Sequence, residues 1–152
     1  METQPDAVIS VLIVDDDPTC REGLRQLLSL APDLKVVGEA SDAEEAYRIG
    51  RRLRPDVVVI DADLPKASCV EMMSRLGRTS FRPDQHPSFI CLAVYPDQHD
   101  AALQAGAVRF LRKDGSRQEL VEAVRAAARA RANGRDFPAP IDPAQQEVAQ
   151  GS

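Results

Sequence analysis

The sequence lacks the features that mark secreted, membrane-spanning and zinc-thiolate proteins. Residues 1–6 contain neither the basic segment nor the apolar run that begins a signal peptide, and no apolar stretch approaches the length of a membrane span. The three cysteines, Cys20, Cys69 and Cys91, are an odd, scattered set without CxxC spacing, which predicts reduced thiols rather than a disulfide framework or a zinc site. We therefore expect a cytoplasmic protein without membrane contact.

The sequence also has no excess of positive charge, and it contains only two histidines. The net charge of −5 argues against a nucleic-acid surface, which would need lysines and arginines gathered on one face. Arg125, Arg129 and Arg131 are expected to form only a solvated face of the last helix. His86 and His99 lie in polar loop sequence without matched ligands, so no metal role is expected for them. What remains is a globular composition in 152 residues, enough for one full-sized core and too few for two ordinary domains.

An apolar segment near the middle of the chain ends in an acidic residue. Val57–Ile60 is a continuous run of β-formers between Pro55 and Pro65, which is typical of a strand buried on both faces in a parallel sheet. Asp61 follows at the carboxyl end of this strand, where open α/β sheets bind ligands. An isolated aspartate at such a position is more often a turn residue, so its interpretation depends on the rest of the chain.

Strand and helix patterns alternate along the sequence. The other predicted strands are Val8–Val14, Leu34–Ala40, Phe89–Val94 and Ala107–Arg112. Helices are predicted after an N-cap at Asp17, after capping boxes at Ser41–Glu44 and Ser116–Glu119, and at residues 70–76 and 97–105. This order predicts a doubly wound parallel α/β sheet of the flavodoxin-like (βα)5 type, with strand order 2-1-3-4-5. The domain is expected over residues 8–131, and residues 132–152 are expected to be a flexible C-terminal tail or a truncated linker.

Acidic residues follow two strands that this fold makes neighbours. Asp15 and Asp16 come directly after the first strand and have no evident structural role, and Asp61 ends the third. Three carboxylates in one cleft repel one another unless a divalent cation neutralises them, and hard oxygen ligands suit Mg²⁺. Lys113, at the end of the fifth strand, is expected to enter the same rim as the only nearby positive charge. A carboxylate nucleophile, Mg²⁺ and a lysine are suited to phosphoryl transfer to an aspartate.

These segments together resemble the response-regulator receiver domains of two-component signalling. The resemblance rests on Asp15-Asp16 after an apolar strand, on Asp61 followed by Leu64-Pro65, and on Gly106-Ala107 leading through Phe110 to Lys113-Asp114. It implies that Asp61 accepts phosphate from a phosphohistidine and that Lys113 pairs with the phosphoryl group. It also implies that Asp15, Asp16 and Asp61 hold Mg²⁺, with the backbone carbonyl of Asp63 completing the metal shell.

The resemblance also implies partners. A sensor histidine kinase or a phosphotransfer protein would supply the phosphate, a homodimer is compatible, and the chain would be a phosphoaccepting signalling protein rather than an enzyme. Lys113-Asp114, in place of a lysine-proline pair, resembles the receivers of regulators with a helix-turn-helix output. DNA would then be contacted only through an output domain, which this sequence does not contain.

The end of the fourth strand is among the positions that depart from the family pattern, and the aromatic residue of the fifth strand has two interpretations. Where the family has Thr or Ser at the end of the fourth strand, the apolar run gives Ala93, whereas an ungapped count back from Gly106 gives Cys91. Ala93 is preferred because Ala-Val-Tyr-Pro-Asp looks like the usual strand exit. A methyl group makes no hydrogen bond to a phosphoryl oxygen, so a weakened switch is expected. Phe110 occupies the aromatic switch position, although plain core packing explains it equally well.

Two other functions fit parts of the sequence. A receiver-like interaction module that no longer uses phosphate would explain Ala93. The sequence Asp61-Ala62-Asp63 after an apolar strand also looks like the first motif of haloacid-dehalogenase-type phosphohydrolases. That enzyme class has its motif near the N-terminus and carries a cap domain, and this sequence matches neither feature.

Overall fold

The computed structural model describes residues 8–61, 64, 71–76, 86–93, 109–113 and 115–132. Its strands are β1 (Ile9–Val14), β2 (Leu34–Ala40), β3 (Val57–Asp61), β4 (Ser88–Ala93) and β5 (Arg109–Arg112). Its helices are α1 (Pro18–Ser29), α2 (Ala43–Leu53) and α5 (Arg117–Ala132), and residues 71–76 are also helical. The helix predicted at residues 97–105 and most of the expected tail lie outside the described residues. Within those ranges no helix has the length and apolar character needed to cross a membrane.

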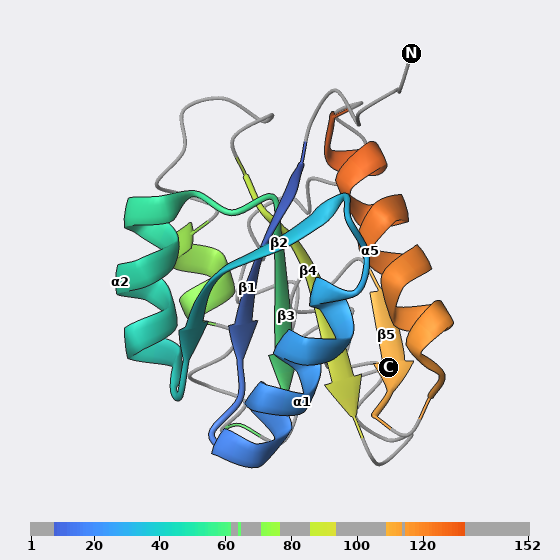
Figure 1. Ribbon diagram of the computed structural model, residues 1–152. Helices are drawn as coiled ribbons and strands as arrows, with labels where there is room; N and C mark the ends of the chain where they lie inside the picture. Colours follow the sequence, from blue (N-terminus) through green and yellow to red (C-terminus); the bar gives the residue numbers. More distant parts are fainter. Residues whose placement is uncertain are drawn as a thin grey trace, which may run out of the picture.

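The five strands form one parallel sheet in the order β2-β1-β3-β4-β5, which confirms the predicted fold class. Helices cover both faces (Figure 1): α2 and residues 71–76 pack on one face, and α1 and α5 on the other. Because successive side chains of a strand point to opposite faces, each inner strand supplies both cores. Leu12 and Val58 belong to the α2 core, whereas Val11 and Val57 belong to the core under α1 and α5. This burial on both faces is why the central strands are continuous apolar runs.

Two helices begin at the predicted caps. The side chain of Asp17 accepts a hydrogen bond from the backbone N–H of Thr19, and Pro18 occupies the first turn of α1, where its missing N–H costs nothing. At α5, Ser116 Oγ accepts from the backbone N–H of Glu119 at 3.1 Å. Both caps satisfy amide groups that a helix leaves unpaired at its first turn.

The predicted cap of α2 was wrong by one residue. Asp42, not Ser41, is the N-cap, and its carboxylate accepts from the backbone N–H of Glu45 at 2.8 Å. Glu45 Oε1 in turn accepts from the backbone N–H of Ser41 at 2.7 Å. Ser41 and Asp42 each have a glutamate three residues further on, so the local sequence fits both registers. Only the folded structure shows that the Asp42 register is the one used.

Hydrogen bonds between Ser10 and Asp56 align the starts of β1 and β3. The backbone N–H and Oγ of Ser10 donate to Asp56 Oδ2 at 2.9 and 3.1 Å, and the Asp56 N–H donates to Ser10 Oγ at 2.9 Å. The register that follows pairs Val14 with Ile60. The next residue on each strand is acidic, so the two strands deliver Asp15 and Asp61 side by side.

An ion pair joins α5 to the connection between α1 and β2. Arg125 donates from Nε to Asp33 Oδ2 at 2.8 Å and from Nη2 to Asp33 Oδ1 at 2.9 Å. These hydrogen bonds lower the pKa of the Asp33 carboxyl and raise the pKa of Arg125. The prediction that Arg125 lies on a purely solvated face is therefore wrong, because the tertiary structure brings Asp33 within its reach.

Candidate functional site

Asp15, Asp16 and Asp61 meet at the carboxyl ends of β1 and β3, the edge that the strand order predicts. One carboxylate oxygen from each residue lies within 4.8 Å of the others. Asp15 and Asp61 are only 0% and 4% exposed, whereas Asp16 is exposed. Figure 1 shows β1 and β3 running next to each other toward this edge. The three carboxylates, referred to below as the acidic cleft, therefore combine two buried acids with one that faces solvent.

Lys113, directly after β5, lies in the acidic cleft. Its Nζ is 3.1 Å from Asp61 Oδ2 and 3.5 Å from Asp15 Oδ2. Burial disfavours the charged ammonium, but the hydrogen bond to Asp61 and the negative charges of Asp61 and Asp15 outweigh it, so the pKa of Lys113 is raised. The lysine is thus positively charged at neutral pH and lies where the sequence predicted it. Its role there stays a prediction.

Asp15 uses its two carboxylate oxygens differently. Oδ1 accepts a hydrogen bond from the backbone N–H of Asp17 at 2.9 Å, a structural role that the sequence did not suggest. Oδ2 is buried and has no hydrogen-bond partner within the described part of the chain. Burial first, and then the charge of Asp61, raise the pKa of Asp15 against the opposing effects of Asp17 and Lys113. A buried polar oxygen that makes no hydrogen bond is costly, and Lys113 Nζ at 3.5 Å compensates it through charge alone. Oδ2 of Asp15 is therefore suited to receive a ligand.

The charges of the acidic cleft fit a divalent cation. Among the described residues, three carboxylates face the ammonium of Lys113, and the neighbouring Arg21 guanidinium is paired with Glu39. Two negative charges are then left over when all of these groups are ionised. A cation of charge two removes this imbalance and gives Asp15 Oδ2 a further partner, and carboxylate oxygens are the ligands that Mg²⁺ prefers. Asp15, Asp16 and Asp61 therefore form a donor set suitable for Mg²⁺. Asp63, whose carbonyl was predicted as a further ligand, lies outside the described residues.

A second cation lies next to the acidic cleft, contrary to the prediction that Lys113 is the only one. Arg21 donates from Nη1 to the backbone oxygen of Asp15 at 2.7 Å, and its Nε is 3.6 Å from Glu39 Oε1. The sequence offered one signal for this contact, since Arg21 follows the N-cap Asp17 by one helical turn. The partners themselves, a backbone oxygen and a residue of β2, leave no trace in local sequence.

The position predicted for the switch, Ala93, is the last residue of β4, and the structure describes its backbone. The residue before it, Leu92, pairs with Asp61, and Ala93 pairs with Arg112, which precedes Lys113. The end of β4 thus lies between the strand ends that carry Asp61 and Lys113. Whether Ala93 weakens the switch stays a prediction.

Cys91, the alternative position, lies two residues inside the strand. It pairs with Ile60 and is buried in the α2 core. Phe110 pairs with Cys91 from β5, and only its backbone is described. The expected role of the Phe110 side chain in switching therefore stays a prediction.

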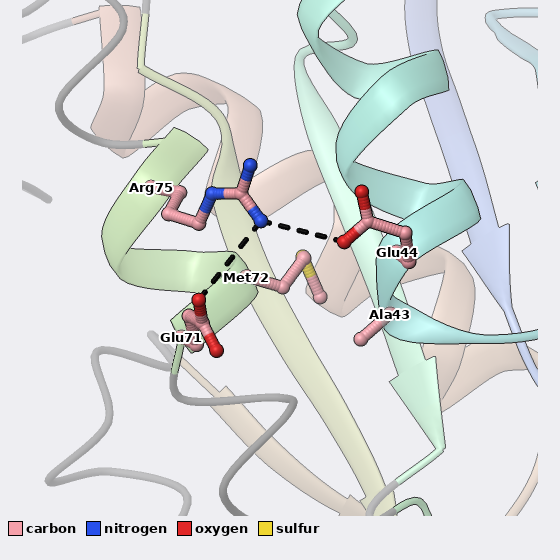
Figure 2. Close-up of a pocket in the computed structure, with 5 residues that line it drawn as sticks. All are labelled: Ala43, Glu44, Glu71, Met72 and Arg75. Carbon is pink, nitrogen blue, oxygen red and sulfur yellow. Dashed lines mark hydrogen bonds and ion pairs between the residues drawn. The ribbon is translucent and has the colours of Figure 1, made fainter.

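A small pocket lies between α2 and residues 71–76 and is crossed by an arginine (Figure 2). Its lining residues are Ala43, Glu44, Glu71, Met72 and Arg75. Arg75 Nη1 lies 3.4 Å from Glu44 and 4.0 Å from Glu71, and its guanidinium stands 3.7 Å from the centre of the Tyr47 ring. These contacts join the two helical segments through an ion pair and a cation–π interaction. The pocket is therefore part of the helix packing and lies outside the acidic cleft.

Comparison with known proteins agrees with this geometry. The family model of the response regulator receiver domain matches residues 11–125. The nitrate/nitrite response regulator protein NarL of Escherichia coli (strain K12) is 33% identical over 121 residues, which cover 78% of this chain and 54% of that protein. The chain spans about half the length of the curated relatives it matches, as the shares of 54% and 56% show.

Two solved structures share the fold and part of the sequence. A two-component response regulator of the LuxR family from Aurantimonas sp. SI85-9A1 has a TM-score of 0.70 at 29% identity, covering 95% of this chain and 98% of that one. The response regulator domain of Thermotoga maritima CheB has a TM-score of 0.69 at 29% identity, covering 80% and 97%. The resemblance inferred from the sequence is confirmed, and this chain belongs to the response regulator receiver domains of two-component signalling systems.

Proposed function

We propose that Asp61 accepts a phosphoryl group from the phosphohistidine of a sensor histidine kinase or of a phosphotransfer protein. The observation that carries this proposal is the charge imbalance of the acidic cleft, in which Asp61 lies 3.1 Å from Lys113 Nζ. A carboxylate oxygen of Asp61 attacks the phosphorus, and the bond between phosphorus and the imidazole nitrogen breaks. The imidazole keeps the electron pair of that bond and takes up a proton, and an aspartyl phosphate is formed.

The residues of the acidic cleft divide the work. Lys113 pairs with an oxygen of the transferred group and offsets part of its negative charge. Asp15, Asp16 and Asp61 would hold Mg²⁺, with the Asp63 carbonyl as a further ligand, and the ion would supply charge stabilisation for the phosphoryl oxygens. The sheet keeps Asp61 in place, since β3 is buried along its whole length. A rigidly placed carboxylate is already close to the geometry that the reaction needs, which lowers the entropic part of the barrier.

The chain acts in this proposal as a signalling domain over residues 8–131 rather than as an enzyme. Relatives such as the transcriptional regulatory protein YxjL of Bacillus subtilis (strain 168) are longer than this chain. Contact with DNA would belong to an output domain outside residues 8–131.

The structural response to phosphate is weak in this proposal because of Ala93. A hydroxyl at the end of β4 would hydrogen-bond a phosphoryl oxygen and draw its loop inward, whereas a methyl group makes no such bond. Supporting this assignment, β4 ends at Ala93 beside the strand end of Asp61. Phosphorylation itself depends on Lys113 and the carboxylates, so it does not require a hydroxyl at position 93.

Intact-mass measurement after incubation with acetyl phosphate and Mg²⁺ tests the phosphoacceptor. Wild-type protein gains one phosphoryl group, and the Asp61→Asn protein gains none. The Asp42→Asn protein serves as the matched control, because it undergoes the same chemical change at the N-cap of α2, where asparagine still caps. Phosphate on Asp61→Asn would assign the acceptor elsewhere. Absence of phosphate on the wild type would favour a phosphate-independent interaction module.

A further inference from the structure

Arg21 connects the edge strand β2 to the acidic cleft. Its side chain is only 20% exposed, Nη1 donates to the backbone oxygen of Asp15 at 2.7 Å, and Nε is 3.6 Å from Glu39 Oε1. A hydrogen bond from a charged donor at this distance is among the stronger kinds in proteins. The guanidinium therefore holds a backbone group directly beside the metal-binding carboxylates.

Asp15 is held on both sides of its backbone. Its N–H donates to the carbonyl oxygen of Ala40 at 3.0 Å, while its own carbonyl accepts from Arg21. Glu39 and Ala40 are consecutive residues at the end of β2. Ala40 thus holds Asp15 directly, and Glu39 holds it through Arg21.

The carboxylate of Asp16 has no described contact that fixes it. No hydrogen bond or ion pair of its carboxylate is found among the residues that the structure describes, and the side chain is exposed. The peptide group is planar, so the carbonyl of Asp15 and the N–H of Asp16 move as one unit. Holding the Asp15 carbonyl consequently sets where the Asp16 side chain begins.

We propose that Arg21 is a positioning residue for the metal side of the cleft, acting through the Asp15 carbonyl on the placement of Asp16. This inference rests on the proposed Mg²⁺ site. It makes a prediction of definite sign, because the charge of Arg21 and its positioning effect act in opposite directions. A nearby positive charge repels a cation, so loss of charge alone would tighten Mg²⁺ binding. Loss of positioning weakens it.

Arg25 provides the matched control. Its Nε lies 3.7 Å from Glu39 Oε2, so it belongs to the same charged network. Its hydrogen bonds and ion pairs among the described residues go to Glu22 and Glu39, not to Asp15. Arg25→Met and Arg21→Met therefore each remove one positive charge and one ion pair with Glu39. Only Arg21→Met also removes the contact with the Asp15 carbonyl.

The first measurement is titration of the full chain with Mg²⁺ alone. Loss of a group that orients metal ligands typically costs about 10- to 100-fold in metal affinity, and we expect this loss for Arg21→Met. Arg25→Met should stay within about twofold of the wild type, since exposed ion pairs contribute little. Arg21→Lys should recover part of the loss, because an ammonium can still donate to a carbonyl. Tighter binding by Arg21→Met, or an equal loss in Arg25→Met, would overturn the proposal.

The second measurement needs no metal and no phosphate. In amide chemical-shift spectra of the metal-free proteins, Arg21→Met should move the resonances of Asp16 and Asp17 more than Arg25→Met does. Equal shifts in the two variants would overturn the positioning role. If the wild type bound no Mg²⁺, the proposed metal site would fail, and the amide comparison would still decide what Arg21 does.

Discussion

Two clusters of charged side chains in this protein use the same kinds of residue and differ in balance. In one, Arg125 meets Asp33 through two hydrogen bonds of 2.8 and 2.9 Å, with both side chains partly exposed. In the other, the acidic cleft, three carboxylates face Lys113 and two of them are almost fully buried. The Arg125–Asp33 pair, called the matched cluster below, balances its own charges, although Arg125 also donates from Nη1 to the exposed Glu122 at 2.8 Å. The acidic cleft holds more negative charge than its lysine can offset.

The directions of the pKa values show what this difference means. Hydrogen bonds from Arg125 lower the pKa of Asp33, so the folded protein favours its charged form. Burial and the charge of Asp61 raise the pKa of Asp15, so the folded protein disfavours its charged form. A matched pair stabilises the fold as it stands. An unmatched cluster has charge left over for a ligand, and this one lies at the end of two central strands, where open α/β sheets bind ligands.

The largest expected effect comes from reducing the imbalance itself. Asp16→Asn removes one charge from the acidic cleft and one ligand of the proposed Mg²⁺ site, and we expect Mg²⁺ affinity to fall on the order of 10- to 100-fold. Asp33→Asn makes the same chemical change in the matched cluster and should leave Mg²⁺ affinity unaltered. Titration of both proteins with Mg²⁺ provides the comparison. Unchanged affinity in Asp16→Asn would show that the cleft is assembled around other ligands.

The Ala93→Thr substitution tests the acidic cleft in a second way, by restoring a hydroxyl at the end of β4. Hydrogen bonds to charged groups contribute roughly 1.5–3 kcal/mol, so a restored hydroxyl should raise the active-to-inactive ratio reached with phosphate on the order of tenfold to a hundredfold. Amide chemical-shift maps with and without a beryllofluoride mimic measure this response. We expect small changes around β5 in the wild type and larger ones in the variant. A wild-type response that already equals that of Ala93→Thr would contradict the weakened switch.

The smallest expected effect is a pH-dependent change in the matched cluster. The pKa of Asp33 lies below its ordinary value of 3.8 in the folded protein, so its pairing stabilises the fold above that value and is lost as pH falls through the folded pKa. Arg125→Met should therefore be less stable than the wild type near neutral pH, and the difference should shrink in acid. Thermal unfolding of both proteins from about pH 7 to about pH 3 measures this trend.

Arg129→Met is the control for that series, since Arg129 is an exposed arginine of the same helix. It should show no comparable dependence on pH. A stability difference between Arg125→Met and the wild type that stayed constant down to the acid limit would mean that Asp33 is not the group responsible.

The sequence by itself determined the sheet and the meeting of Asp15, Asp16 and Asp61. Both follow from short-range patterns: apolar runs predict buried strands, and the alternation of strands and helices predicts a parallel sheet whose carboxyl ends share one edge. Once β1 and β3 are neighbours, an acidic residue directly after each strand has little freedom in where it lies. Burial of β3 on both faces left its own trace in the sequence, as an uninterrupted β-branched run.

Only the tertiary structure decided the partners of the long charged side chains and the choice between competing caps. Asp33 and Arg125 are 92 residues apart, so no local pattern links them. Arg21 donates to a backbone oxygen, and its position one helical turn after the N-cap does not identify that partner. Ser41 and Asp42 fit the same capping rule, and the folded structure uses Asp42. The physical reason is the range of the interactions. The burial of a strand depends on its own side chains, so local sequence reveals it. A flexible guanidinium pairs with whichever group the packed elements bring near it, so local sequence does not identify its partner.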